Sequence, residues 1–451
     1  MRIVIVGGGL VGSTLAEKLS RSGQDVALVE SDAGRIAELS ERLDAQVLHG
    51  NGTTIRILRE AGIEEASLVV ATTASDEANM VVGLIAALRF DVPRSVVRLR
   101  DPDHAESFAR MVESSAGEHV VVNPDAAAVD RILSLLEVPG ALDVVSFFDD
   151  RLLVAGFRIA EQSDFKGLLV SHMNLLFAGT PTLIAAIHRA DEWIIPHGDE
   201  DIRANDLIYF AFDRSELESI LHLVGAREER GTHLMVGGAT RLGLELASRL
   251  EQRRSRVVLI DDDPERARVA AERLNDTLVV LGSITNQDLL EEHAIERVST
   301  FIATSDDNEV NLVAGLLAKR LGARRAFALI ETPGLADLIG EVAIDAAISP
   351  RLLAIGLTLQ HIQGGGVHSV AALTEDRVEI IDADAVAGSP ITSGALADVA
   401  LPRGVLLAAL RRGADVLLPS GDDRVEPGDE MLFITTTEQA DKLSAYLSPD
   451  A

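Results

Sequence analysis

Short apolar runs alternate with segments of helical period over the first part of the chain. The segments between the runs carry apolar residues three or four positions apart, which predicts amphipathic helices. Runs that are apolar at every position are typical of strands buried on both faces, and hence of a parallel sheet. Right-handed crossovers then predict a doubly wound α/β layer. The apolar runs are Ile3–Val6, Val26–Val29, Val47–Leu48, Leu68–Ala71 and Val96–Leu99.

The next part of the chain has a different pattern. Val144–Phe148 and Leu152–Phe157 flank Asp149-Asp150 and predict a β-hairpin. A helix is expected at Ser215–Leu223. This pattern predicts a small α+β domain with further short strands at Leu183–Ile187, Trp193–Ile195 and Ile208–Phe212.

Both patterns recur in the second half of the chain. RIVIVGGGLVG at 2–12 returns as HLMVGGATRLG at 233–243, and ATTASDEAN at 71–79 returns as ATSDDNEVN at 303–311. PHGDEDIRANDLIYF at 196–210 likewise resembles PSGDDRVEPGDEMLF at 419–433. We infer a duplicated gene: two tandem Rossmann-like doubly wound parallel sheets, each followed by a small α+β domain. Segments with glycine or proline interrupt the pattern at three points and predict domains at 1–138, 139–225, 226–363 and 364–451.

The first apolar run leads directly into Gly7-x-Gly9-x-x-Gly12 and a predicted helix. In this context Gly7 permits a tight turn, Gly9 lets a pyrophosphate approach the backbone, and Gly12 allows close helix–strand packing. The helix N-terminus offers free N–H groups to the phosphates. Glu30 ends the second run, where a carboxylate can accept hydrogen bonds from both ribose hydroxyls and repel the extra phosphate of NADP. The motif therefore favours NAD(H); the alternative is a glycine turn in a domain without a ligand.

Two polar loops follow the third and fourth runs, where ligands bind in open α/β sheets. They are His49–Thr53 and Thr72–Glu77, and their small polar residues suit contacts to adenine and ribose. Asp76 is either a ligand contact or only the N-cap of the next helix. The candidate binding residues of these loops are Asn51, Thr72, Thr73, Ala74 and Glu77.

Two arginines follow in the fifth run. Arg98 and Arg100 are predicted to share one face of the strand, because strand side chains alternate. A phosphate or an acidic neighbouring subunit would suit them, and the alternative is that both arginines simply face solvent.

The second copy departs from the glycine pattern. Thr240 replaces the second glycine, and its side chain would crowd the close approach of a ligand. Leu329 and Glu331 stand where the first copy has Arg98 and Arg100. The second site could bind a nucleotide in another pose, bind it weakly, or be purely structural. Its candidate residues are Gly238, Thr240, Gly243, Asp261, Ser283 and Thr304.

Composition excludes several classes of protein. Lys+Arg 41 against Asp+Glu 71 gives a net charge of −30, which makes nucleic acid an unfavourable partner. The acid excess suggests a high-salt host, and arginine-rich codon usage is the rival explanation for the few lysines. With no cysteine, a disulfide scaffold and a thiolate site are excluded.

Motifs for catalysis and for membranes are missing as well. No Walker A lysine, His-Glu-x-x-His zinc signature or dehydrogenase Tyr-Lys pair occurs, so we expect no catalytic residue and no metal site. No apolar segment reaches the length of a membrane span, and no signal peptide is predicted at the start.

The chain resembles the TrkA-type regulatory subunits of bacterial Trk/Ktr potassium uptake systems, which carry tandem RCK (KTN) domains. Each RCK domain has an NAD-binding half and a small C-terminal half. By this resemblance, NAD(H) would contact Gly7, Gly8, Gly9, Leu10, Val11, Glu30, Thr73, Ala74 and Arg98, with Arg98 reaching across a subunit interface. The matching stretches are 3–19, 71–80, 97–104, 135–147, 205–212, 301–311, 316–323 and 345–352.

The resemblance implies a gating regulator rather than an enzyme. It would lie in the cytoplasm, peripheral to the inner face of the cell membrane, beneath an integral-membrane potassium-translocating subunit of TrkH/KtrB type. A homotetramer would form a ring of Rossmann units, to which the apolar helices Val81–Leu88 and Leu312–Leu317 could contribute an interface if they are not core. NAD(H) would occupy the first unit, and NAD(H), ATP/ADP or nothing the second. The alternatives are an NAD-dependent oxidoreductase and an RCK-type regulator of a different ion carrier.

Overall fold

The computed structural model describes residues 1–172, 177, 181–190, 192–225, 233–332, 344–362, 367–373, 378–399 and 401–447. The chain divides into two compact units. One comprises Met1–Asp130 and Thr232–Ile362, and the other comprises Arg131–Gly231 and Gln363–Ala451. Each unit therefore takes one part from each copy of the repeat. The domain boundaries expected at 225/226 and 363/364 adjoin residues outside the described ranges, so the four-domain division stays a prediction.

The first copy begins with a six-stranded parallel sheet of order β3-β2-β1-β4-β5-β6. Four of its first five strands are buried along nearly their whole length, which confirms the prediction of strands covered on both faces, whereas β3 is exposed at both ends. The sixth strand was not predicted, because it lies at the sheet edge and is only half-buried. The strands are β1 (Arg2–Val6), β2 (Asp25–Glu30), β3 (Gln46–His49), β4 (Leu68–Ala71), β5 (Arg94–Arg98) and β6 (Glu118–Val122).

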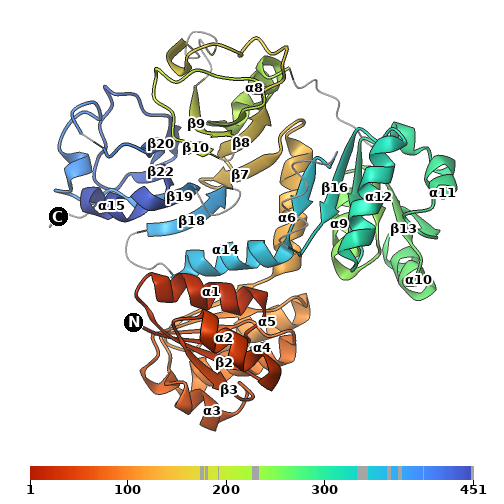
Figure 1. Ribbon diagram of the computed structural model, residues 1–451, viewed down its shortest axis with the longest axis vertical. Coiled ribbons are helices and arrows are strands. Elements are labelled where there is room, and N and C mark those ends of the chain that lie inside the picture. The colour runs from red at the N-terminus through yellow and green to blue at the C-terminus, as the bar shows by residue number, and fades with distance from the viewer. Residues whose placement is uncertain are drawn as a thin grey trace. The chain divides into compact units, whose positions relative to one another are not determined.

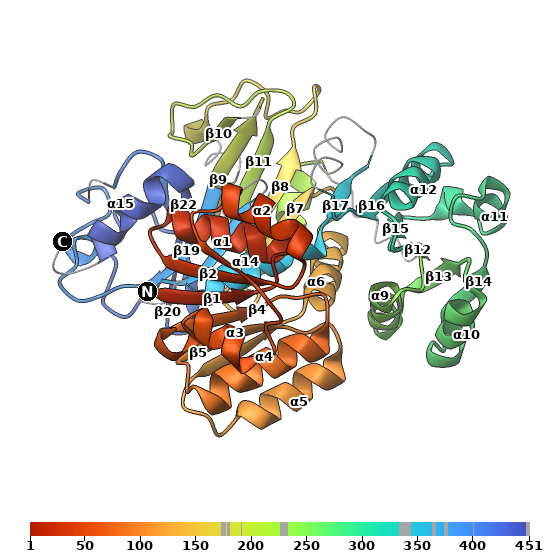
Figure 2. The ribbon, with the colours of Figure 1, turned by 60° about the horizontal axis from the view of Figure 1, so that its bottom comes forward.

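Helices cover both faces of this sheet (Figures 1 and 2). One face packs Leu15 of α1 and Leu39 of α2 against the strands, and the other packs Val82 of α4 and Phe108 of α5. In Figure 2 the two groups of helices lie above and below the sheet. The helices are α1 (Leu10–Arg21), α2 (Ala33–Arg42), α3 (Ile55–Glu60), α4 (Asp76–Arg89), α5 (Pro102–Val112) and α6 (Pro124–Glu137).

The second copy repeats the layer with the order β14-β13-β12-β15-β16-β17, again parallel. Its strands are β12 (His233–Gly237), β13 (Arg256–Asp261), β14 (Leu278–Leu281), β15 (Thr300–Ala303), β16 (Arg325–Leu329) and β17 (Ala346–Ile348). Its described helices are α9 (Arg241–Gln252), α10 (Pro264–Arg273), α11 (Gln287–Glu292), α12 (Asn308–Arg320) and α14 (Pro350–Ile362). The two doubly wound sheets expected from the repeat are thereby confirmed.

The last helix of each layer packs on the other layer. From α14, Ala354, Ile355 and Ile362 join the apolar cluster that contains Leu15 of α1. From α6, Asp125 pairs with Arg241 of α9 at 2.7 Å, and Asp130 pairs with Arg249 at 2.5 Å. The two copies thus exchange helices within this unit, one through an apolar contact and one with ion pairs.

The second unit contains two antiparallel five-stranded sheets, ordered β10-β9-β11-β8-β7 and β18-β19-β22-β20-β21. The predicted hairpin is present, with Phe148, Asp149 and Asp150 at positive φ in its turn. One cluster joins side chains of both sheets, among them Tyr209 and Leu432. The elements are β7 (Asp143–Phe147), β8 (Leu152–Arg158), β9 (Thr182–Arg189), β10 (Glu192–Ile194), β11 (Leu207–Asp213), α8 (Leu217–Leu223), β18 (Val367–Leu373), β19 (Val378–Asp384), β20 (Val405–Arg412), β21 (Asp415–Leu417), β22 (Glu430–Thr436) and α15 (Thr437–Leu447).

A buried aspartate before the central strand clamps each of these sheets. Asp206 accepts two hydrogen bonds from Arg189, at 2.9 and 2.8 Å, and Asp429 accepts two from Arg412 at the same distances. Burial opposes the ionisation of Asp429, but the Arg412 guanidinium outweighs it and holds the pKa of this carboxyl below its ordinary value. The matching GDEDIRAND and GDDRVEPGD segments therefore preserve a structural ion pair.

We expect Asp206→Asn to lower the free energy of unfolding of the second unit by about 3 kcal/mol, because it leaves Arg189 without its buried carboxylate. Trp193, the single tryptophan, is buried in the same unit, so its fluorescence during a urea titration reports this loss. Asp201→Asn is the matched control: that side chain is 43% exposed, and its loss should cost less than about 1 kcal/mol. Equal shifts for the two variants would contradict the clamp.

Candidate functional site

The glycine turn between β1 and α1 is shaped by packing at two of its glycines. Gly7 has φ +106°, and a Cβ there would lie 2.9 Å from the Thr73 backbone nitrogen. A Cβ at Gly12 would lie 1.9 Å from the Gly7 carbonyl oxygen, so no side chain fits. The roles predicted for Gly7 and Gly12 are therefore confirmed: a turn that needs positive φ, and a helix that approaches its strand closely.

Gly9 has no such packing reason to be glycine. Its φ is −62°, which any residue adopts, and a Cβ there would meet no atom within 4 Å. Gly9 is also the N-cap of α1, and no side chain caps that helix. Backbone N–H groups at the start of α1, including those of Leu10 and Val11, therefore face an open position suited to an anion.

Glu30 at the end of β2 holds the turn from the side. Its two carboxylate oxygens accept hydrogen bonds from the backbone N–H groups of Gly8 and Asp32, each at 2.8 Å. Burial opposes ionisation of this carboxylate, but the backbone hydrogen bonds outweigh burial and lower its pKa. Glu30 is therefore ionised near neutral pH, and the remaining lone pairs of its oxygens can accept hydrogen bonds from ribose hydroxyls.

The loops after β3 and β4 are held by their own side chains. The Asn51 side-chain oxygen Oδ1 accepts hydrogen bonds from the Thr53 N–H and hydroxyl, and the Glu77 carboxylate accepts one from the Ser75 hydroxyl. Thr72 is buried, and its hydroxyl has no hydrogen-bond partner among the described residues. These two loops and Gly9 all lie at the carboxyl edge of the sheet, and Ala74 lies in the second loop.

A fully buried asparagine that the sequence did not single out organises the second loop. Asn79 accepts hydrogen bonds from the Thr73 backbone N–H and hydroxyl, and its amide donates to the Arg98 carbonyl oxygen at 2.9 Å. Asn311 makes the same bonds in the second copy, to Ser305 and Leu329. The repeated final Asn of ATTASDEAN and ATSDDNEVN was the available signal.

The interpretation of Asp76 as an N-cap is wrong. The cap of α4 is Ser75, whose hydroxyl oxygen accepts a hydrogen bond from the Ala78 N–H. Asp76 begins the helix and instead accepts hydrogen bonds from the backbone N–H groups of Arg100 and Asp101, each at 2.8 Å. It thereby joins the loops after β4 and β5.

Arg98 is buried at the carboxyl end of β5. Its Nε has no hydrogen-bond partner among the described residues, and burial together with the nearby Arg100 lowers its pKa to about 10. The strand ends at Arg98, so Arg100 lies in the following loop and not on the strand face as predicted. A buried guanidinium with an unpartnered donor is suited to an anionic ligand.

The second copy keeps the turn but fills the open position. Gly238 has φ +115°, and a Cβ at Gly243 would lie 1.9 Å from the Gly238 carbonyl oxygen. The Thr240 hydroxyl accepts a hydrogen bond from the Gly243 N–H and donates one to the Thr304 carbonyl oxygen. The Thr304 hydroxyl donates to the Gly238 carbonyl oxygen at 2.8 Å. Thr240 thus caps α9, where the first copy leaves α1 without a side-chain cap.

The second acidic residue is neutralised as well. Asp261 accepts hydrogen bonds from the backbone N–H groups of Ala239 and Asp263, as Glu30 does in the first copy. Arg266 also pairs with Asp261 at 2.9 Å, and this interaction raises the pKa of Arg266. By contrast, the nearest arginine to Glu30 is Arg35, at 3.8 Å. Ser283 of the neighbouring loop hydrogen bonds to Thr285.

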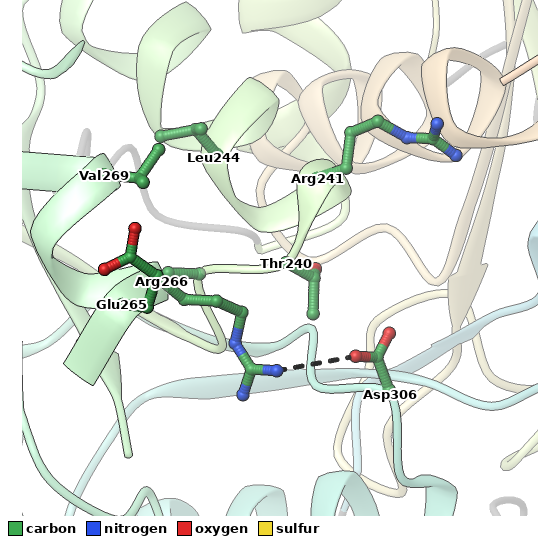
Figure 3. Close-up of a pocket in the computed structure, with 8 residues that line it drawn as sticks. Thr240, Arg241, Leu244, Glu265, Arg266, Val269 and Asp306 are labelled. Atoms are coloured by element: carbon green, nitrogen blue, oxygen red, sulfur yellow. Dashed lines mark ion pairs between the residues drawn. The ribbon is translucent and has the colours of Figure 1, made fainter. Parts of the chain in front are cut away.

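A cavity of about 330 Å³ lies beside this second turn (Figure 3). Arg266 and Asp306 face each other at 3.9 Å, whereas the Arg241 side chain extends in another direction. Leu244 and Val269 supply apolar surface. The cavity combines an apolar wall with charged groups, a composition that suits a small polar ligand.

Two features are missing from the described ranges. No group of three or more histidine, aspartate or glutamate side chains is placed to hold a metal ion there. No helix within those ranges has the length and apolarity to cross a membrane.

Comparisons with known proteins agree with this geometry. A family model described as the TrkA-N domain matches residues 3–124 and 234–350, and one described as the TrkA-C domain matches residues 383–448. The chain is 33% identical over 436 residues to the Trk system potassium uptake protein TrkA of Halomonas elongata, covering 96% of this chain and 95% of the relative. It is 31% identical to the protein of the same name from Vibrio alginolyticus, covering 100% and 99%.

Solved structures support the fold. The GsuK RCK domain matches with a TM-score of 0.62 and 19% identity, covering 99% of this chain and 94% of that one. The GsuK channel bound to NAD matches with the same score and identity, covering 99% and 78%. The match of an RCK domain over both copies agrees with tandem RCK architecture.

The glycine turn yields a test of packing alone. We expect Gly9→Thr, which introduces the residue of the second copy, to leave the free energy of unfolding of the first unit unchanged or raise it by up to about 1 kcal/mol, since threonine can cap α1. Gly12→Ala should unfold the first layer or lower its melting temperature strongly, because its Cβ would overlap the Gly7 carbonyl. Differential scanning calorimetry compares the two variants. A Gly9→Thr protein as unstable as Gly12→Ala would contradict an open position at Gly9.

Proposed function

Because the chain belongs to the family of the Trk system potassium uptake protein TrkA, we propose that it regulates potassium uptake by a membrane transporter and senses NAD(H) in its first Rossmann unit. The assignment of NAD(H) to the first unit rests on Gly9. No packing in the described structure explains a glycine at this position, and a pyrophosphate at the N-terminus of α1 does.

The remaining candidates of the first site complete an adenine dinucleotide pocket. Glu30 binds the ribose hydroxyls and disfavours a ribose phosphate, which selects NAD(H) over NADP(H). Gly7 to Val11 hold the pyrophosphate, and the loops that carry Asn51 and Thr72–Glu77 flank the adenosine. Arg98 supplies a positive charge for an anion, either in the same pocket or at a neighbouring subunit. One solved neighbour of this fold is a GsuK channel bound to NAD.

The second pocket takes a different role. Thr240 occupies the position of the approaching pyrophosphate and caps α9, and Arg266 neutralises Asp261. These changes disfavour the dinucleotide pose of the first unit. Of the three occupancies, NAD(H), ATP/ADP and none, the apolar wall and the charged rim favour a smaller adenine nucleotide.

We assign a gating role without catalysis. In the first site Glu30, Asn51 and Thr73 are engaged in hydrogen bonds that hold the loops, so they bind and position rather than transfer protons. A ligand that binds one arrangement of the subunits better shifts the population toward it. The partner is an integral-membrane potassium-translocating subunit of TrkH/KtrB type, with this chain peripheral on its cytoplasmic side.

A homotetrameric ring gives the partner a symmetric binding surface. Equivalent helices of the two copies expose apolar residues at the same position, Val81 of α4 at 41% and Val313 of α12 at 53%. Leu88 of α4 is 53% exposed. Apolar surface repeated on both copies suits a contact between neighbouring Rossmann units in such a ring.

Calorimetric titration with NADH tests the ligand. Glu30→Gln should weaken binding at the first site about ten- to a hundredfold, since it replaces a charged acceptor. Gly9→Thr should abolish binding there. Asp261→Asn is the matched control in the second copy and should leave first-site affinity unchanged. Identical isotherms for all four proteins would contradict the first site, and NADH oxidation with added carbonyl compounds would instead favour an oxidoreductase.

Transport tests the regulatory role itself. The chain and its co-expressed membrane partner, reconstituted in lipid vesicles, should show potassium flux that changes with added NADH. The same vesicles with the Gly9→Thr protein should give flux that is insensitive to NADH. Flux independent of this chain would contradict the proposal, and failure to co-purify with a potassium transporter would favour a different ion carrier.

The ring is tested by mass in solution. We expect Val81→Glu combined with Val313→Glu to convert tetramers into smaller species, because buried charge disfavours the contact. Leu417→Glu is the control, since Leu417 is similarly exposed, at 42%, but lies in β21 of the other unit. Mass photometry distinguishes the species, and unchanged tetramers in the double variant would exclude this interface.

A further inference from the structure

The two exchanged helices differ in chemistry at matching positions. At the start of α6, the segment Asn123-Pro124-Asp125 corresponds to Ser349-Pro350-Arg351 at the start of α14. On the side of α9, Arg241 corresponds to Leu10 of α1 in the repeat. A charged contact therefore exists at the junction of α6 and α9, where the matching junction of α14 and α1 is apolar.

Arg241 both lines the second pocket and forms an ion pair with α6. It is the first residue of α9, next to Thr240, and it lines the cavity of the second pocket. Its guanidinium donates to Asp125 of α6 at 3.0 and 2.7 Å. Figure 3 shows the side chain directed away from Arg266 and Asp306. The residue nearest the start of α9 is thus held by a helix from the other copy.

This pair can exchange partners. The Arg241 side chain is 45% exposed, whereas Asp125 is 19% exposed and lies in the first turn of α6, so Arg241 is the partner with open space around it. Arg241 also lines the cavity beside the capped start of α9, so a phosphate held in that cavity would attract the same guanidinium. Asp125 and the phosphate are both anions, so only one of them can take the full charge of Arg241.

We propose that a phosphate-bearing adenine nucleotide in the second pocket competes with Asp125 for Arg241, so that occupancy of this pocket breaks the ion pair between Arg241 and Asp125 at the start of α6. This inference rests on the proposed nucleotide-sensing function and identifies Arg241 as the residue that responds to a ligand in the second pocket. Arg249 and Asp130, one to two turns further along, hold the helices together but take no part in the competition, because Arg249 does not line the cavity.

The test uses the full chain with Gly9→Thr, which closes the first site. Calorimetric titration with ADP and with NADH then reports the second pocket alone. Asp125→Asn should tighten binding about two- to fivefold, the size that a partly exposed ion pair contributes. Asp130→Asn is the matched control and should leave affinity unchanged.

Arg241→Leu, which installs the residue of the first copy, supplies the second variant. It should weaken binding, and adding Asp125→Asn to it should have no further effect. Equal affinities for the Asp125→Asn and Asp130→Asn proteins would overturn the competition, as would full affinity in Arg241→Leu. Absence of heat with both ADP and NADH would also overturn the competition. That result would leave the first-site proposal intact, because first-site binding is measured separately. It is the NADH binding that the wild-type chain shows and the Gly9→Thr protein lacks.

Discussion

The close approach of a helix to the strand before it determines the geometry of both candidate sites. At Gly12 and at Gly243 a Cβ would lie 1.9 Å from the carbonyl oxygen of the glycine that opens the turn. This contact brings the first turns of α1 and α9 to the carboxyl edge of their sheets. The acidic residue that ends the next strand then lies within hydrogen-bond reach of the turn, as Glu30 does for Gly8 and Asp261 for Ala239. The rest of each site is arranged around that fixed helix end.

Positions without a packing role differ between the two copies, and these are the ones that carry information about ligands. Gly9 and Thr240 occupy the same place in the turn, with φ of −62° and −61°. Nothing in the backbone therefore demands glycine at one and threonine at the other. An open helix end in the first copy and a capped one in the second are consistent with selection on what binds there, because the fold tolerates both.

Local patterns made much of this structure predictable. Apolar runs predicted the parallel strands, the Asp149-Asp150 pair predicted the hairpin turn, and the glycine spacing predicted the steric roles of Gly7 and Gly12. Interactions between distant segments were not predictable in the same way. Asp76 is of a residue type that often caps helices, but its carboxylate accepts a hydrogen bond from the backbone N–H of Arg100, 24 residues later in the chain. Arg241 and Asp125 are 116 residues apart, and only the exchange of α6 between the copies brings them together.

The corresponding helices α6 and α14 make different kinds of contact, so the two copies of the duplicated fold are not equivalent. Within the first unit, Asp125 and Asp130 of α6 form ion pairs with arginines of α9. Within the second unit, Arg131 of α6 pairs with the buried Asp143. Asp143 also accepts a hydrogen bond from Tyr209 at 3.1 Å. In the second copy the repeat places Leu357, Ser369 and Leu432 at the corresponding sequence positions, and these uncharged residue types cannot form ion pairs. Apolar contacts change little with the charge of a nearby ligand, whereas ion pairs respond to it directly. Under the proposed competition, a change of charge at the second pocket would therefore act on the contact between Arg241 and α6, whereas the apolar contact of α14 with α1 contains no such ion pair.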